Sequence, residues 1–154
     1  MQDLRTYFGE WPYKRDTYAL LVDYLNEMGA RAIAFDIVFA DPHEGDERLG
    51  EAIVRSGNVV LAASALNEGE LAEQASADLS RLAWQVPSGL RAYVWPDVQL
   101  PLSALTRRAT QQVQAGVVSV VTDKDGVLRR LPLFHRVNGY YLPSFPLAAQ
   151  FSGE

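Results

Sequence analysis

The stretch Arg31-Ala-Ile-Ala-Phe-Asp-Ile-Val-Phe39 decides the fold class of this chain, because it is apolar at nearly every position. In an extended chain its odd-numbered side chains point to one face and its even-numbered side chains to the other. A strand that is apolar on both faces is typical of a parallel sheet covered by helices on both sides. The stretch therefore predicts a buried strand of an α/β domain.

The segments around this strand complete a strand–helix–strand unit. Residues 17–28 carry apolar side chains at the spacing of one helical face, and Gly29 follows where a left-handed residue ends a helix. After the strand, a helix is expected from Asp46 to a stop at Gly57, and residues 58–63 form a second apolar stretch. This order is that of a βαβ unit with a parallel sheet.

The rest of the chain predicts shorter elements. Residues 66–100 hold several prolines and glycines, which favour loops with a short helix or a short edge strand near residues 93–95. A helix is expected over residues 102–112, a strand over 116–121 and a short helix over 144–151.

Two chain reversals are expected in the last third of the sequence. Asp123-Lys-Asp-Gly126 turns the chain into a strand over residues 127–137, and Asn138-Gly139 turns it again. The predicted fold is thus a single three-layer αβα domain over residues 1–154, with a mixed sheet that is parallel in the centre and an antiparallel meander at the C-terminal end.

Composition excludes several classes of protein. The chain has 154 residues, 48% of them hydrophobic and 21% charged, which is ordinary for one globular domain. A net charge of −5 argues against nucleic-acid binding, which needs clustered Lys and Arg. Because there is no cysteine, disulfides and thiolate metal sites are excluded. There is no run of apolar residues long enough to cross a bilayer and no signal-peptide pattern.

Asp36 is the sharpest candidate for chemistry. A carboxylate inside an apolar strand is costly to bury unless it is paired or neutralised. It stands near the carboxyl end of the strand, where open α/β sheets place their ligands. Ligand binding, metal binding and phosphate acceptance are open readings of Asp36. Equally open is a structural reading, in which Asp36 accepts backbone hydrogen bonds or pairs with Arg129 or Arg130.

No established catalytic or metal motif accompanies Asp36. The acidic loop over residues 41–47 lacks the alternation of a calcium loop and favours a solvated surface. His43 and His135 stand far apart without a zinc-binding pattern, and no phosphate-binding loop or nucleophile elbow occurs. We therefore expect no metal, no cofactor and no catalytic residue.

These segments, taken in order, resemble the CHASE type 2 family, the cyclase and histidine-kinase associated sensory extracellular domains. The resembling motifs are Trp11-Pro12 before a helix, Gly29-Ala-Arg-Ala-Ile-Ala-Phe-Asp-Ile-Val-Phe39, Asp46-x-x-Leu49-x-x-Ala52, Gly57-Asn-Val-Val-Leu-Ala62, Gly116-Val-Val-Ser-Val-Val, Asp125-Gly-Val-Leu-Arg-Arg-Leu-Pro-Leu133 and Leu142-Pro-Ser144. The resemblance spans nearly the whole chain and is least distinctive over residues 64–100.

The resemblance implies a sensory domain on the extracytoplasmic face of the bacterial inner membrane, excised from a larger receptor whose flanking transmembrane helices are absent here. The output would be an adenylate or guanylate cyclase, a histidine kinase, a Ser/Thr kinase or a diguanylate cyclase. The signal would be a small molecule or a protein, and the receptor would act as a homodimer. By motif position, the residues implied to bind ligand or border a site are Trp11, Asp36, Asp46, Asp125, Arg129 and Arg130.

Two other functions compete with the sensor. One is a small hydrolase or phosphatase-like enzyme that uses Asp36. The other is a pure dimerisation module without a ligand, which predicts no pocket lined by converging polar groups.

Overall fold

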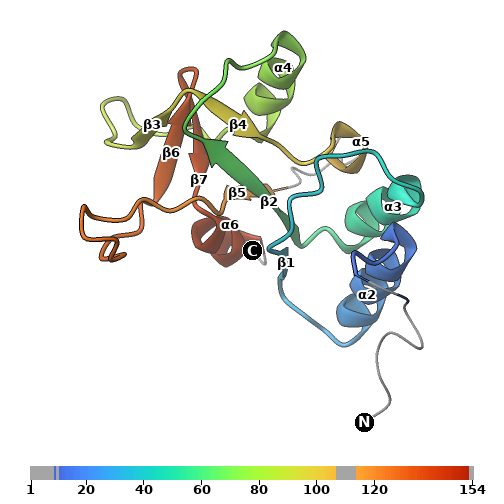
Figure 1. Cartoon of the computed structure of the whole chain (residues 1–154). Helices are drawn as coiled ribbons and strands as arrows, with labels where there is room; N and C mark the ends of the chain where they lie inside the picture. Colours follow the sequence, from blue (N-terminus) through green and yellow to red (C-terminus); the bar gives the residue numbers. More distant parts are fainter. Residues whose placement is uncertain (1–8, 10, 107–113, 153–154) are drawn as a thin grey trace.

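The computed structural model describes residues 9, 11–106 and 114–152 of the chain. Within these ranges helices and strands alternate along much of the sequence (Figure 1). The helices are α2 (Arg15–Glu27), α3 (Asp46–Ser56), α4 (Glu73–Leu82), α5 (Ser103–Thr106) and α6 (Phe145–Phe151). The strands are β1 (Ile33–Phe35), β2 (Val59–Leu66), β3 (Tyr93–Trp95), β4 (Asp97–Gln99), β5 (Gln114–Val117), β6 (Phe134–Val137) and β7 (Tyr140–Pro143).

Strand β2 is the centre of the fold. Its first half pairs in parallel with both β1 and β5, and Val60 and Leu61 have partners in both, so these two strands lie on opposite edges of β2. Its last three residues pair antiparallel with β4. Residues Val59 to Ala63 are all buried, as expected for a strand covered on both faces.

The C-terminal strands form a second sheet rather than an extension of the first. Its order is β3-β6-β7, with β3 parallel to β6 and β6 antiparallel to β7 across the Asn138-Gly139 turn. A single bridge between Val117 and Ser144 joins β5 to the end of β7. The α/β class with mixed pairing is confirmed, but the expected single mixed sheet is divided in two.

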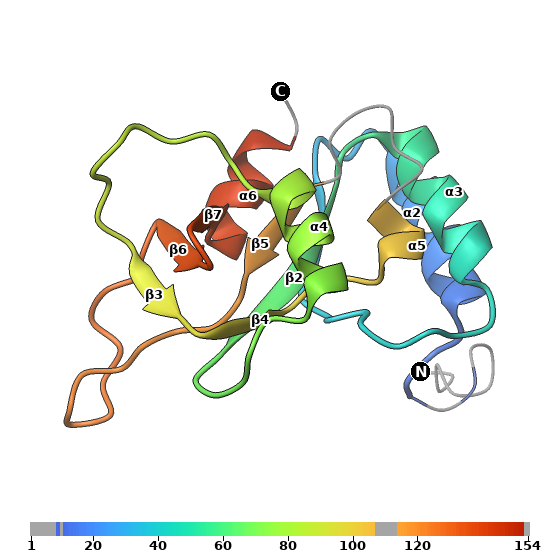
Figure 2. The same ribbon diagram turned by 90° about the horizontal axis from the view of Figure 1, so that it is seen from above.

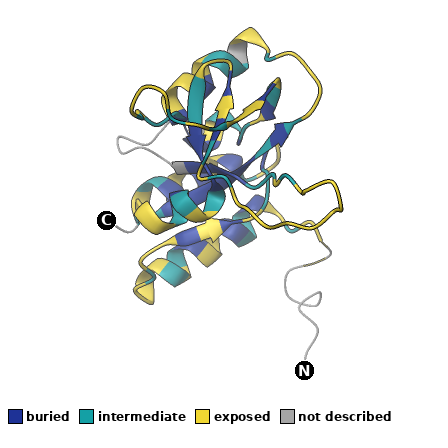
Figure 3. Cartoon of the chain, turned by 90° about the vertical axis from the view of Figure 1, so that its left-hand side faces the viewer, coloured by how far each residue is buried: buried dark blue, intermediate teal, exposed yellow. Residues whose placement is uncertain are grey.

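Helices cover the two faces of the β2–β5 pair (Figure 2). On one face α2, α3 and α5 pack against β1 and β2 around Phe39, Leu49 and Leu61. On the same face further along, α4 and the second sheet enclose another core around Leu79 and Leu142. The opposite face is covered by α6. Buried positions concentrate on the strands and on the inward sides of these helices (Figure 3).

Helix α6 approaches the sheet so closely that Gly116 has no room for a side chain. A Cβ atom there would lie 2.5 Å from Cα of Phe145 and 3.0 Å from Cβ of Ala148. Since Ala62 is the partner of Gly116 in β2, small residues on two neighbouring strands form the seat of α6.

The strand predicted over residues 31–39 is much shorter than expected and is buried on one face only. Only residues 33–35 are β-strand, and Ala34 and Asp36 are exposed. The prediction that this stretch is covered on both faces is therefore wrong. The physical reason is that β1 is an edge strand and the short helix α6 covers β2 and β5 but does not extend over β1.

Most predicted helices are confirmed. Helix α2 ends before Gly29 and α3 ends at Gly57, and both glycines have a left-handed φ, of 81° and 70°. Residues 66–100 contain both a short helix, Glu73–Leu82, and a short strand, Tyr93–Trp95, and the helix expected over 144–151 is seen at Phe145–Phe151. The helix expected over 102–112 is seen at Ser103–Thr106, and residues 107–112 lie outside the described part. The strand expected over 127–137 is confined to Phe134–Val137.

We predict that Gly116→Ala lowers the free energy of unfolding by about 2–3 kcal/mol, because the added methyl group must displace the backbone of α6. The measurement is urea denaturation followed by circular dichroism. Gly50→Ala is the matched control. Its new Cβ would lie 3.0 Å from the carbonyl oxygen of Ala104, which is a less severe contact than at Gly116, and alanine is favoured within a helix. We therefore expect it to cost less stability. A cost at Gly116 no larger than that at Gly50 would contradict the packing of α6 described above.

Candidate functional site

The segment from Val118 to Leu133 connects the two sheets and is held by its own polar contacts. Asp123 N–H donates to the carbonyl of Val127 at 3.0 Å, and Gly126 N–H donates to the carbonyl of Asp123 at 2.8 Å. The turn predicted over residues 123–126 is therefore present. It closes a loop, not a regular hairpin of long strands.

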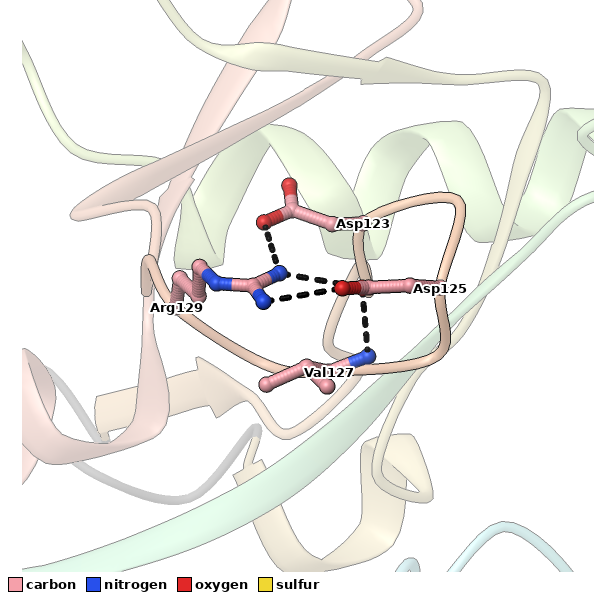
Figure 4. Close-up of polar contacts among 4 residues, drawn as sticks. All are labelled: Asp123, Asp125, Val127 and Arg129. Atoms are coloured by element: carbon pink, nitrogen blue, oxygen red, sulfur yellow. Dashed lines mark hydrogen bonds and ion pairs between the residues drawn. The ribbon is translucent and has the colours of Figure 1, made fainter.

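Arg129 is the ionic centre of this loop (Figure 4). Its guanidinium donates to Asp125 through two nitrogens, at 2.9 and 2.8 Å, and to Asp123 at 3.0 Å. The hydrogen bond from Arg129, helped by one from the backbone of Val127, lowers the pKa of Asp125, and the pKa of Arg129 is raised in return. All three side chains are exposed, so the cluster shapes the loop more than it stabilises the domain.

A cavity of about 190 Å³ lies between this loop, the end of β1 and the start of α6. We call it the Asp36 cavity. Its polar walls are Asp36, Ser119, His135 and Ser144, and its apolar walls include Leu131 and Phe145. The parallel pairing of β1 and β5 with β2 places Asp36 and Ser119 beyond the carboxyl ends of these strands, where α/β sheets commonly bind ligands.

His135 is the most unusual group in the cavity wall. The residue is fully buried, and the indole N–H of Trp95 donates to its Nδ1 at 3.0 Å. Burial lowers the pKa of His135 to about 4, so the ring is neutral at pH 7. Since Nδ1 accepts a hydrogen bond, the ring proton resides on Nε2. That buried N–H has no hydrogen-bond partner among the described residues.

A second, more open hollow of about 540 Å³ lies on the other side of the loop. We call it the Arg130 cleft. It is lined by Arg91, Tyr93, Asp123 and Arg130, and it shares Leu131 and Pro132 with the Asp36 cavity. The segment 131–132 thus separates the two hollows, and a change in the loop alters both.

Asp46 lies in a different part of the fold and has a structural role. Its Oδ1 accepts a hydrogen bond from Nε of Arg15 at 2.8 Å, and its Oδ2 accepts one from the backbone N–H of His43 at 2.7 Å. Arg15 also stacks over the ring of Phe39 at 4.4 Å. This nearly buried pair joins the start of α2 to the start of α3. The N-cap of α3 is Gly45 and the helix begins at Asp46, as predicted.

Trp11 is also remote from the cavity. Its ring is 63% exposed and makes edge contacts with Tyr13 and Tyr18, whose ring centroids lie at 5.5 and 6.5 Å. It contributes to an apolar groove along α2 with Leu21 and Tyr24.

The six residues singled out from the sequence are therefore not one site. Asp125 and Arg129 shape the loop, Arg130 lies in the cleft beside it, Asp36 lines the cavity beneath it, and Trp11 and Asp46 are elsewhere. One of the open readings of Asp36, an ion pair with Arg129 or Arg130, is wrong, because Arg129 binds Asp123 and Asp125 and no ion pair to Asp36 occurs within the described ranges.

Sequence reasoning missed Ser119, His135, Ser144 and Trp95. These residues are brought together from four segments, and no local motif marks them. The one available indication was His135 itself, an imidazole between apolar residues on the short strand Phe134–Val137.

The cavity shows no nucleophile–base pair and no metal cluster among the described residues. Ser119 donates its hydroxyl to the carbonyl of Ala65 at 3.0 Å, and no imidazole contacts it in the part of the chain that the structure describes. No group of three or more His, Cys, Asp or Glu suited to a metal ion occurs among the described residues.

Comparison with protein families identifies the class. The model of the CHASE2 domain matches residues 1–153, so the chain belongs to the CHASE2 domain family. CHASE2 is a sensory domain family of receptors, and its domains are extracytoplasmic sensors. Searches of curated proteins and of solved structures found no match. Among the described helices, none has the length and apolar character needed to span a membrane.

We predict that the domain loses stability between pH 7 and pH 5 because of His135. The unfolded chain takes up a proton near the ordinary histidine pKa of 6.5, whereas the folded chain does so only near 4. The unfolded state therefore binds more protons in this range, and stability falls by about 2 kcal/mol as the pH drops to 5.

Urea denaturation at the two pH values measures this change. The variant His43→Asn removes the other, exposed histidine and should lose the same amount of stability. Equal stability of the native chain at pH 7 and pH 5 would show that His135 is not held neutral by burial.

Proposed function

We propose that this chain is the extracytoplasmic sensory domain of a bacterial transmembrane signalling receptor. The observation that carries the proposal is the CHASE2 match over residues 1–153, since that family consists of receptor sensory domains. The domain receives a small-molecule or protein signal outside the cytoplasm. It passes the signal to an adenylate or guanylate cyclase, a histidine kinase, a Ser/Thr kinase or a diguanylate cyclase.

The loop over residues 118–133 is the part of the domain best suited to respond to a signal. A ligand can only shift an equilibrium by the difference in its affinity for two states. The loop borders two hollows and is held by exposed ion pairs, which are worth little individually. A change in the conformation of the loop therefore requires little free energy. The ends of the loop continue directly into β5 and β6.

The sensor acts without catalysis in this proposal. An Asp36-dependent hydrolase would need a nucleophile with a base beside it or a metal cluster, and the described residues around Asp36 supply neither. The free carboxylate of Asp36 and the protonated Nε2 of His135 are instead suited to holding a ligand.

One observation also favours a homodimer. Helix α2 and its flanking segments expose an apolar face that consists of Trp11, Leu20, Leu21, Tyr24 and Met28. Contiguous exposed apolar surface of this kind commonly marks a site of contact with another protein. We propose that two copies of the receptor meet along this face of α2, so that a change in the domain alters the spacing of the following segments.

We predict that the domain is reached from outside the cytoplasm in the intact receptor. The described chain has no cysteine, so Glu68→Cys introduces one reactive thiol at an exposed loop position. In whole cells a membrane-impermeant maleimide should label this variant of the full-length receptor more strongly than the receptor without the substitution. Labelling that requires permeabilised cells would contradict the extracytoplasmic location.

The homodimer predicts a concentration-dependent mass in analytical ultracentrifugation. Tyr24→Glu places a charge on the apolar face of α2 and should shift the protein to the monomer. Val94→Glu is the control, because Val94 is 69% exposed on β3 and lies away from α2, and it should leave the dimer intact. A monomer at all concentrations, or equal effects of the two variants, would exclude this interface.

A further inference from the structure

We propose that the Asp36 cavity binds a free amino acid in its zwitterionic form, with the ammonium group at Asp36 and the carboxylate at His135 and Ser144. This inference rests on the proposed sensory function and names the chemical class of its signal. It follows from the charges, hydrogen-bonding groups and size of the cavity.

The carboxylate end is defined by donors without acceptors. The Nε2–H of His135 is buried and has no partner within the described residues, although a buried donor without an acceptor is unfavourable. The hydroxyl of Ser144 lines the same cavity and makes no side-chain capping bond to α6. An anionic oxygen placed between these groups would satisfy both.

The ammonium end is defined by Asp36. Its carboxylate lines the cavity, is exposed, and has no ion pair or hydrogen bond within the described ranges. Arg129, one of the two cations considered as its partner, is held by Asp123 and Asp125 instead. Asp36 therefore favours a positively charged ligand group at the mouth of the cavity.

Together the two ends select for a ligand that carries both charges. A simple carboxylate would satisfy His135 but would be repelled by Asp36. A simple amine would bind Asp36 but would leave the Nε2–H of His135 without an acceptor. A zwitterion satisfies both ends at once.

The size and walls of the cavity limit the rest of the ligand. A volume of about 190 Å³ is below the range of about 300–1,000 Å³ that is common for drug-sized ligands. This volume suits a single amino acid better than a peptide or a nucleotide. The remaining walls include Val117, Val120, Leu131, Pro132 and Phe145, which favour an aliphatic side chain.

The test uses thermal shift and calorimetry to compare three compounds that share the same branched alkyl group. L-Valine carries both charged groups, isobutylamine lacks the carboxylate, and 3-methylbutanoate lacks the ammonium group. We expect L-valine to raise Tm in a concentration-dependent manner and each analogue to bind at least 10-fold more weakly. An analogue that binds as tightly as L-valine would overturn the zwitterion assignment.

Variants test whether the ligand binds in the Asp36 cavity. Asp36→Asn removes an exposed charge without changing the size of the side chain, and it should weaken L-valine binding at least 10-fold. Glu68→Gln removes an exposed carboxylate outside the cavity and should have no effect. In the ¹⁵N spectrum of the histidine side chains, Nε2 of His135 should shift when L-valine binds. Unchanged binding by Asp36→Asn, or an unchanged His135 signal, would overturn the site.

The same assay with all the proteinogenic amino acids decides the inference as a whole. If none of them raises Tm up to 10 mM, the cavity is not an amino-acid site and the inference fails. The maleimide labelling of the intact receptor is independent of this result. If the receptor is labelled from outside but no amino acid binds, only the proposed class of ligand is excluded. If the receptor is labelled only after permeabilisation, the proposed sensory function is excluded.

Discussion

The close approach of α6 to β5 at Gly116 is the constraint on which the rest of the structure depends. Because there is no space for a Cβ atom, the start of α6 rests directly on the β2–β5 pair. This contact fixes Ser144 and Phe145 beside Val117, and these residues form one wall of the Asp36 cavity. It also ties the second sheet to the first, since β7 leads directly into α6.

The βαβ unit could be predicted from the sequence because its signals are local. Helical spacing over residues 17–28, the stop glycines and the apolar run of β2 specify these elements without reference to distant residues. The division into two sheets could not be predicted, because an apolar run does not reveal which strand it will pair with. The predicted length of β1 was wrong for a related reason. Because β1 lies at the edge of the sheet and α6 is too short to cover it, Ala34 and Asp36 are exposed.

The candidate site was predictable only in part. Asp36 was identified for two reasons: burial within a strand, which is wrong, and its place near the carboxyl end of β1, which does bring it to a cavity. Asp125 and Arg129 were identified together and do bind each other, but in order to shape a loop. His135 was missed because its significance depends on Trp95, 40 residues earlier in the chain, which fixes the position of its proton.

The central claim is that α6, seated on Gly116, builds the wall of the cavity and couples it to the sheet. Backbone amide chemical shifts of Gly116→Ala, compared with the native domain at low temperature, test this claim most directly. The account predicts large changes at Ser144, Phe145 and His135 and small changes across α2 and α3. Changes confined to residues 115–117, or changes as large in α2 as in α6, would contradict it.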